Sequence, residues 1–364
     1  MNEQTTQGAN IDIEFQLLER ILIDPLSLPN VASFEAETIS FLITKDHPQR
    51  LQFTLPLLAA ASDRVYVLDS SRGSDTRNLC SALGFPSVRY HGPQEQDQAF
   101  SLSPVLQRAL ASGFLTKFSD DCWDIWSKRN YALVFSLLNE FSRILLIDDD
   151  VITSKGLIQD AISLSGTYSL IGAKICGMPD RSVVGHICLL LNLVNQRFIS
   201  GHFLAVNVSS AAAFYFPNVY NEDWIFMLLN SLNAPIARYG TIFHLYWNPY
   251  DETGGRAAFE EKGEILIEGL ARLILSGAGI TRLGESEHWE GVICERRQKL
   301  DKLTSTDVVR SSPALKAILE CCRSVASRLR PGDFVSFWND YNNKVGEWRA
   351  IINLARSSKG GFIG

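Results

Sequence analysis

The chain has 364 residues, of which 46% are hydrophobic, 10% aromatic and 20% charged, and its formal net charge is −6. This length suggests two domains, or one large α/β domain with extensions, and it allows a large core without disulfides or metals. The composition excludes wholesale disorder, and the mild acidity argues against a general nucleic-acid-binding protein.

Cysteine usage and the absence of targeting signals indicate a compartment. The seven cysteines show no CxxC or Cys/His zinc spacing, which favours a reducing environment over a disulfide framework. The polar N-terminus does not resemble a signal peptide. The longest apolar stretch, 183–194, contains His186 and is too short to span a bilayer. We therefore expect a cytoplasmic protein without a transmembrane segment.

The first half of the chain alternates short apolar runs with stretches of helical spacing. A tail through residue 11 and an amphipathic helix at 12–23 precede this region. The alternation predicts a mostly parallel sheet flanked by helices, the α/β class. The strands are expected at 39–44, 64–68, 87–90 and 142–147, the helices at 49–61, 75–83 and 127–140, and a polar irregular stretch with helical patches at 92–124.

The second half begins with strands and loops over 168–215 and then becomes helical, and beyond about residue 280 strand signals fade. We expect helices at 222–232, 256–276, 313–329 and 332–355. The chain is accordingly divided into an N-terminal tail and helix (1–38), an α/β domain (39–275) and a helical C-terminal extension (276–364).

Polar clusters follow three of the predicted strands. They contain Asp46, Asp69 and the run Asp148–Asp150. In open α/β sheets, ligands bind outside the carboxyl ends of the strands. Three adjacent carboxylates repel one another, and a divalent cation with hard oxygen ligands, Mg²⁺ or Mn²⁺, would neutralise them. The alternative interpretation is a solvated acidic turn that ends a strand.

Six segments in order resemble the GT-A glycosyltransferases, particularly the family-2-like enzymes that use nucleotide sugars. The resemblance covers about residues 39–250. The segments are ISFLITKDHPQR from Ile39, VYVLDSSRGSD from Val65, SKRNYAL from Ser127, the DxD of Asp148 and Asp150, FISGH from Phe198, and NEDW from Asn221.

The resemblance implies a GT-A fold, which is Rossmann-like with a mostly parallel central sheet, and transfer of a sugar from a nucleotide sugar to a hydroxyl acceptor. A UDP-sugar is the donor that such families use most often. The implied metal ligands for Mn²⁺ or Mg²⁺ are Asp148, Asp150 and His244. The implied nucleotide-sugar contacts are Thr44, Asp46, Asp69, Lys128, Arg129, Asp149, Gly201 and His202. The implied general base is Asp223, with Glu222 as the second choice.

Several alternatives stay open. The pair Glu222–Asp223 could simply complement the dipole of a following helix, and His244 could be an ordinary buried histidine. The second strand ends in Asp-Ser-Ser where the family usually has Asp-Asp-Gly-Ser, which leaves the nucleotide open. Rival functions are a phosphatase of the haloacid-dehalogenase type, a nucleotidyltransferase, and a catalytically inactive GT-A-like interaction domain.

The segment 296–330 is basic in an acidic protein, with nine Lys and Arg against three Asp and Glu. It could contact an anionic acceptor, an acidic partner or a membrane surface, so peripheral membrane contact is one expectation. A solvated helical face explains the same composition.

Overall fold

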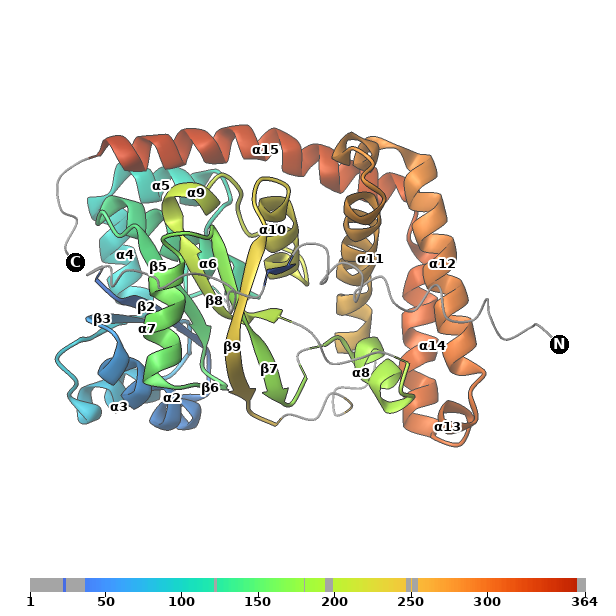
Figure 1. Cartoon of the computed structure of the whole chain (residues 1–364), viewed down its shortest axis with the longest axis horizontal. Coiled ribbons are helices and arrows are strands. Elements are labelled where there is room, and N and C mark those ends of the chain that lie inside the picture. The colour runs from blue at the N-terminus through green and yellow to red at the C-terminus, as the bar shows by residue number, and fades with distance from the viewer. Residues whose placement is uncertain are drawn as a thin grey trace.

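The computed structural model describes residues 22–23, 37–120, 123–179, 181–193, 199–246, 250 and 255–358. Within these ranges the chain forms one central sheet with helices on its faces, and a block of long helices stands beside the sheet (Figure 1). The predicted α/β class, with a mostly parallel central sheet and a helical C-terminal extension, is therefore confirmed.

The sheet has nine strands in the order β1-β9-β7-β8-β5-β2-β3-β4, and β6 pairs with β9. Strand β8 runs antiparallel to both of its neighbours, and the short β6 runs antiparallel to β9, whereas the remaining pairs are parallel. The strands are β1 (Leu22–Ile23), β2 (Ile39–Thr44), β3 (Arg64–Asp69), β4 (Val88–His91), β5 (Arg143–Asp148), β6 (Val151–Ile152), β7 (Leu170–Gly177), β8 (Ile199–Asn207) and β9 (Ile236–His244).

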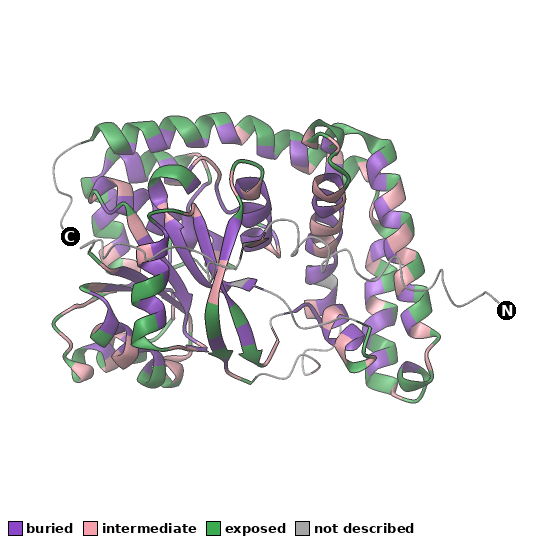
Figure 2. Cartoon of the chain, in the orientation of Figure 1, coloured by how far each residue is buried: buried purple, intermediate pink, exposed green. Residues whose placement is uncertain are grey.

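Continuous apolar runs produce the centre of this sheet. Every residue of β2 is buried, and so is every residue of β5 except Arg143, because helices cover both faces. Figure 2 shows this buried interior and the exposed outer sides of the helices. The helices of the sheet domain are α2 (Pro48–Ala61), α3 (Asp75–Leu83), α4 (Pro93–Leu102), α5 (Pro104–Ala111), α6 (Ile125–Leu138), α7 (Lys155–Leu164), α8 (Val183–Leu190), α9 (Val208–Ala211) and α10 (Glu222–Ser231).

The strand order contains a topological switch point between β2 and β5. From β2 the chain proceeds outward through β3 to β4, and it then returns to place β5 on the other side of β2. A crevice forms outside the carboxyl ends of the strands at such a point, and ligands of open α/β sheets bind there. Because β8 is antiparallel, its first residues lie at this same edge.

Three local expectations need correction or completion. Residues 22–23 of the expected helix 12–23 form β1, which pairs with β9, and the rest of that segment lies outside the described residues. The stretch 92–124 contains two regular helices, α4 and α5. The strands and loops expected over 168–215 are wrong at 183–190, which form α8, and this helix begins where Ser182 Oγ accepts a hydrogen bond from the Gly185 N–H. Short apolar runs do not distinguish the two structures by periodicity.

The C-terminal helices are joined to the sheet domain through a shared core. The longest, α15, runs along the upper side of the molecule in Figure 1, and its buried side chains belong to the same apolar cluster as residues of β2, α5 and α6. Trp348 donates a hydrogen bond to the Ala212 carbonyl and contacts the rings of Phe114 and Tyr215. The helices of this block are α11 (Gly255–Ser276), η2 (Ile280–Gly284), α12 (Ser286–Thr304), α13 (Asp307–Arg310), α14 (Pro313–Arg328) and α15 (Pro331–Ser357).

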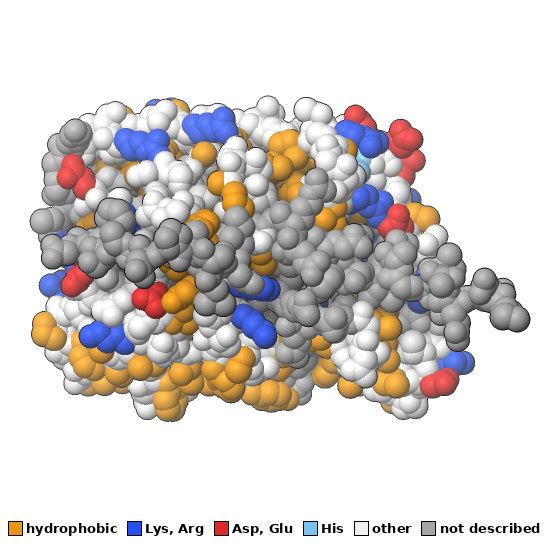
Figure 3. Space-filling view, viewed as in Figure 1, with side chains coloured by type: hydrophobic (Ala, Val, Ile, Leu, Met, Phe, Trp, Pro, Cys, Tyr) orange, Lys and Arg blue, Asp and Glu red, His pale blue; other side chains and the backbone are white. Residues whose placement is uncertain are grey.

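Most of the basic side chains in 296–330 have local partners. Arg296 is fully buried between α11 and α12 against Glu261, Glu264 and Glu268, and Arg297 donates to the carbonyls that end α14. Four more basic residues form ion pairs with nearby acids. On the face shown in Figure 3, basic and acidic side chains are interspersed over these helices. Among the described residues, no helix combines the length and apolar character of a membrane span.

The contacts of Trp348 predict a measurable coupling between α15 and the sheet domain. Trp348→Ala should lower the free energy of unfolding by about 3–5 kcal/mol, because it removes a buried indole and leaves a cavity. Trp348→Phe keeps most of the volume and should cost about 1–2 kcal/mol, chiefly through the lost hydrogen bond. Urea denaturation followed by circular dichroism measures both.

Leu354→Ala, on an exposed position of the same helix, is the matched control and should change stability little. Equal, small effects of Trp348→Ala and Leu354→Ala would show that α15 is not anchored through this side chain.

Candidate active site

The candidate site lies at the carboxyl edge of the sheet, around the turn that follows β5. Two pairings bring histidines to this turn. Ile147 pairs with Phe203 across β5 and β8, which places His202 next to Asp148. Val151 pairs with His244 across β6 and β9, which places His244 next to Asp150. The site is thus assembled from four strand ends that are distant in the sequence.

Each carboxylate of the acidic run has its own partners. Asp148 Oδ2 lies 2.5 Å from His202 Nδ1 and 3.3 Å from Arg129 Nη2. Asp149 accepts a 2.6 Å hydrogen bond from Thr44 Oγ1 and a 3.2 Å hydrogen bond from Arg50 Nη1. The three side chains are therefore held apart in fixed directions, and the solvated acidic turn does not describe them, because Asp148 and Asp149 are buried.

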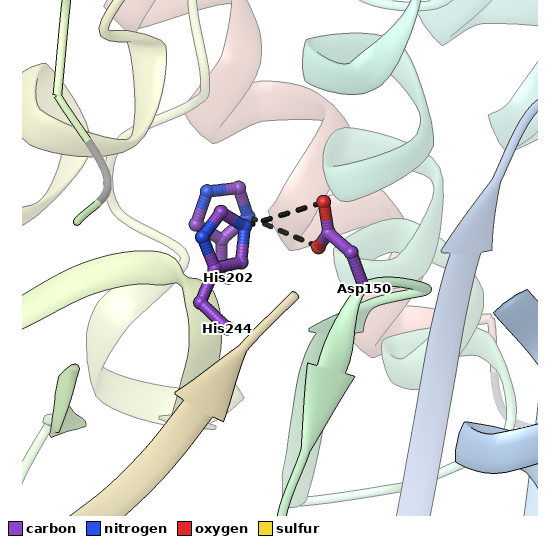
Figure 4. Close-up of side chains that lie close together, drawn as sticks. All are labelled: Asp150, His202 and His244. Atoms are coloured by element: carbon purple, nitrogen blue, oxygen red, sulfur yellow. Dashed lines mark ion pairs between the residues drawn. The ribbon is translucent and has the colours of Figure 1, made fainter. Parts of the chain in front are cut away.

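Asp150 faces two stacked histidine rings (Figure 4). Its Oδ2 lies 3.2 Å from His244 Nε2 and 3.2 Å from Arg50 Nη1, and its Oδ1 lies 3.9 Å from His202 Nδ1. The centroids of the two imidazole rings are 4.5 Å apart with an interplanar angle of 27°. One ligand atom from each of Asp150, His202 and His244 can be chosen so that all three lie within 4.8 Å of one another, a spacing that suits one metal ion.

Two buried polar atoms in this group lack a hydrogen-bond partner among the described residues: Asp150 Oδ1 and His244 Nε2. His244 Nδ1 lies 2.9 Å from the Met178 carbonyl oxygen, which can only accept, so Nδ1 carries the proton. In the neutral ring, Nε2 then presents a lone pair toward a carboxylate oxygen. Two acceptors facing each other repel, and a cation between them removes the repulsion.

The pKa values in the acidic run differ in direction. Burial raises the pKa of Asp149 to about 7, and the neighbouring Asp150 charge adds to this effect. Burial acts the same way on Asp150, but the neighbouring side chains of His244, His202 and Arg50 outweigh it and lower the pKa of Asp150 below its usual value. Asp150 is thus the carboxylate that the surroundings keep ionised.

Arg129 links the acidic run to the start of α10. Its guanidinium donates to Glu222 Oε1 at 2.6 Å, to Asp148 at 3.3–3.4 Å and to the Gly201 carbonyl at 3.2 Å. Burial raises the pKa of Glu222, against the opposing charge of Arg129. Lys128 is also buried, and its Nζ donates to the Thr44 carbonyl at 2.8 Å. Both cations organise the strand ends from within the protein.

Asp223 lies at the first turn of α10 and contacts β8. Its Oδ2 accepts a 2.8 Å hydrogen bond from the Gly201 N–H, and its Oδ1 accepts one of 2.9 Å from the Trp224 N–H. A Cβ atom at position 201 would stand 2.5 Å from Asp223, so this close approach requires glycine. The preceding Asn221 adopts φ of 65°, a left-handed conformation that is costly for a residue other than glycine. Strained backbone of this kind is frequent at functional sites.

Asp69 and Asp46 border the same edge on the β3 side. Asp69 is completely buried, and its carboxylate accepts hydrogen bonds from Ser71 and from the Tyr90 hydroxyl at 2.8 Å. The Asp46 N–H donates to Ser71 Oγ at 2.7 Å. The observed contacts of Asp69 thus organise the turn after β3, and any contact with a nucleotide would add to them.

The structure brings the acidic run, His202, His244, Arg129 and the Glu222–Asp223 pair to one edge. Arg50 is the functional residue that the sequence analysis missed. It lies in the first turn of α2, directly after the polar loop that follows β2, and it neutralises two carboxylates at once. The sequence feature that could have indicated Arg50 is its position only six residues after the end of β2.

No family model and no curated protein matches the sequence. Among solved structures, S. aureus TarS 1–349 in complex with UDP-GlcNAc is 13% identical, covers 80% of this chain and 90% of its own, and has a TM-score of 0.41. A longer S. aureus TarS chain is 14% identical over 79% of this chain and 53% of its own, with a TM-score of 0.40. A protein described as a nucleotide-diphospho-sugar transferase from Desulfovibrio desulfuricans G20 is 10% identical over 58% and 82%, with a TM-score of 0.36. At these identities and scores, the function must be argued from the site.

The site geometry predicts a divalent cation bound by Asp150, His202 and His244. His244→Gln removes the ring nitrogen that faces Asp150, so Mn²⁺ affinity should fall about tenfold or more. Isothermal titration calorimetry with Mn²⁺ alone measures this effect.

The matched control is His288→Gln, which changes a buried histidine of the C-terminal helices that contacts the Gly269 carbonyl. It should leave Mn²⁺ affinity unchanged. If wild type, His244→Gln and His288→Gln bind Mn²⁺ equally, the cation does not lie between these side chains.

Proposed function

We propose that this protein is a metal-dependent glycosyltransferase of the GT-A type, which moves a sugar from a nucleotide-diphosphate sugar to a hydroxyl acceptor. The observation that carries the proposal is the pair of buried, unpartnered atoms, Asp150 Oδ1 and His244 Nε2, at the switch point of the sheet. Two buried acceptor atoms that face each other are stabilised by a cation between them. The crevice at a switch point is where open α/β sheets bind nucleotides.

The donor would lie across the switch point. Thr44 ends β2 and Asp69 ends β3 in matching register, so the loops after them form one side of the crevice. The acidic run after β5 forms the other side. In this arrangement the nucleoside of the donor would bind beside the loops after β2 and β3, and its diphosphate would lie near Asp150. A UDP-sugar is the first donor to test, because the resemblance in sequence favours it.

Asp150, His202 and His244 would hold Mn²⁺ or Mg²⁺, which when bound supplies Lewis-acid stabilisation of the diphosphate leaving group. Arg50 and Arg129 keep the surrounding carboxylates in place, because each guanidinium contacts two acidic side chains. They prevent the acidic run from separating before the donor binds. Lys128 fixes the carbonyl at the end of β2 and so preserves the shape of the donor side.

Asp223 is the better candidate for the general base. Glu222 Oε1 lies 2.6 Å from Arg129 Nη1, so this side chain is engaged in an ion pair, and it is buried. Asp223 accepts two backbone hydrogen bonds, which orient its carboxylate, and an oriented carboxylate can act as a general base. With Asp223 as the base, the acceptor hydroxyl would attack the sugar carbon directly.

Donor binding should depend on the cation and on Asp150. Asp150→Asn keeps the side-chain shape but removes the charge, so the Mn²⁺-dependent rise in melting temperature with UDP-sugars should disappear, since only binding to the native state raises apparent stability. A thermal-shift series of UDP- and GDP-sugars with and without Mn²⁺ measures this.

Asp160→Asn is the matched control, because Asp160 hydrogen-bonds Tyr239 on the surface, away from the acidic run. It should keep the full shift. A wild-type protein that no nucleotide sugar stabilises would refute the proposed function.

Asp223→Asn separates catalysis from helix capping. The amide still accepts a hydrogen bond from the Gly201 N–H but cannot take a proton, so turnover should fall roughly 10²–10⁴-fold with donor binding preserved. Steady-state kinetics and the thermal-shift assay together measure this. Turnover within tenfold of wild type would assign the proton transfer to another group.

A further inference from the structure

Three aromatic side chains form an exposed cluster near the start of α10. Trp123 and Phe259 are 44% and 46% exposed, and their ring centroids lie 5.4 Å apart at an interplanar angle of 59°. The Tyr220 ring lies 6.1 Å from Phe259 at 71°. We call these three residues the aromatic cluster. The rings of the cluster are inclined to one another, and those of Trp123 and Phe259 are exposed to solvent.

Three separate parts of the chain supply this cluster. Trp123 precedes α6, Tyr220 precedes α10, and Phe259 lies in the second turn of α11. A Cβ atom at Gly263, one turn after Phe259, would stand 2.2 Å from the Tyr220 carbonyl oxygen, so α11 lies directly against the Tyr220 backbone. The Trp123 carbonyl accepts a hydrogen bond from the Trp126 indole at 2.9 Å. The positions of the rings are therefore fixed by contacts outside the cluster itself.

The cluster adjoins the candidate active site. Tyr220 is three residues before Asp223, so their Cα atoms are at most about 11 Å apart. Trp123 precedes the helix that carries Arg129, which contacts Glu222. Tyr220 thus lies close to the proposed base along the chain, and its ring contacts Phe259. Tyr220 and Phe259 are on the α10–α11 side of the site, and Trp123 directly precedes Asp124, which pairs with Lys128.

Polar side chains lie near Phe259 along α11. Next to Phe259 on α11, Arg256 Nε donates to Glu260 Oε1 at 2.7 Å, and Asn221 Nδ2 donates to Glu264 Oε1 at 3.1 Å. Binding sites that combine aromatic faces with a few oriented polar groups are typical of ligands with both apolar and hydroxyl-bearing surfaces. A pyranose ring has this character, because one face presents C–H groups and the rim presents hydroxyls.

We propose that Trp123, Tyr220 and Phe259 form the acceptor platform, and that the acceptor is therefore a carbohydrate whose ring stacks on Trp123 and Phe259. This inference rests on the proposed function, since it names the substrate class of the same site.

The test is carbohydrate binding without turnover. Wild-type protein is applied to a glycan array in the presence of Mn²⁺ and UDP, and the strongest glycan is then titrated calorimetrically into wild type, Trp123→Ala, Phe259→Ala and Leu102→Ala. Leu102 is an exposed apolar residue of α4 outside the site, and its variant is the control. Affinity should fall about tenfold or more in the two aromatic variants, the loss that removing an aromatic stacking partner causes, and stay unchanged in the control.

Thermal shifts with UDP-sugars and Mn²⁺ on the same four proteins separate the two proposals. Unchanged donor binding with lost glycan binding supports the platform. Glycan binding that depends on the aromatic cluster, in a protein that no nucleotide stabilises, would refute the transferase and retain the platform. If no glycan on the array binds wild type, or if Trp123→Ala and Phe259→Ala bind as wild type does, the acceptor platform is refuted.

Discussion

Neutralising three consecutive carboxylates at the end of a buried strand is the constraint on which the site depends. Asp148, Asp149 and Asp150 leave β5 in a region from which water is largely excluded, where mutual repulsion is much stronger than in solution. Two arginines reduce this repulsion, Arg50 on one side of the acidic run and Arg129 on the other. Each guanidinium contacts two acidic side chains. Glu222 and Asp223 add two further carboxylates, so the two arginines do not balance the acidic groups, and this excess of negative charge is the surrounding that the proposed cation would enter.

The antiparallel strand β8 makes this arrangement available. In an entirely parallel sheet, the strand next to β5 would present its last residue at the carboxyl edge. Because β8 runs the other way, it presents Gly201 and His202 there instead. Gly201 then allows Asp223 to approach its backbone, and His202 contacts Asp148. One reversal of strand direction thus connects the acidic run with the start of α10.

The sequence predicted the strands of this sheet well where burial on both faces leaves an uninterrupted apolar run, as in β2, β3 and β5. It also indicated which acidic residues end those strands. It did not predict Arg50, because the position of this residue just after a strand end does not show that its side chain reaches a turn 99 residues later. The helix α8 was mistaken for a strand because it is apolar on all sides, and it is apolar because it packs in one cluster with α14 rather than on the sheet. The assignments of individual site residues stay predictions.

The long helices affect the site through α6. This helix carries Lys128 and Arg129. The next residue, Asn130, fixes the segment before α10, because its amide donates a hydrogen bond to the Phe216 carbonyl and accepts one from the Phe216 N–H, both at 2.9 Å. On its outer side, α6 shares the apolar core that includes Trp348 of α15. A shift of α15 would therefore move the same helix that aligns Arg129 with Glu222 and Asp148. Through this shared core, α15 hence stabilises the position of the helix that carries Lys128 and Arg129.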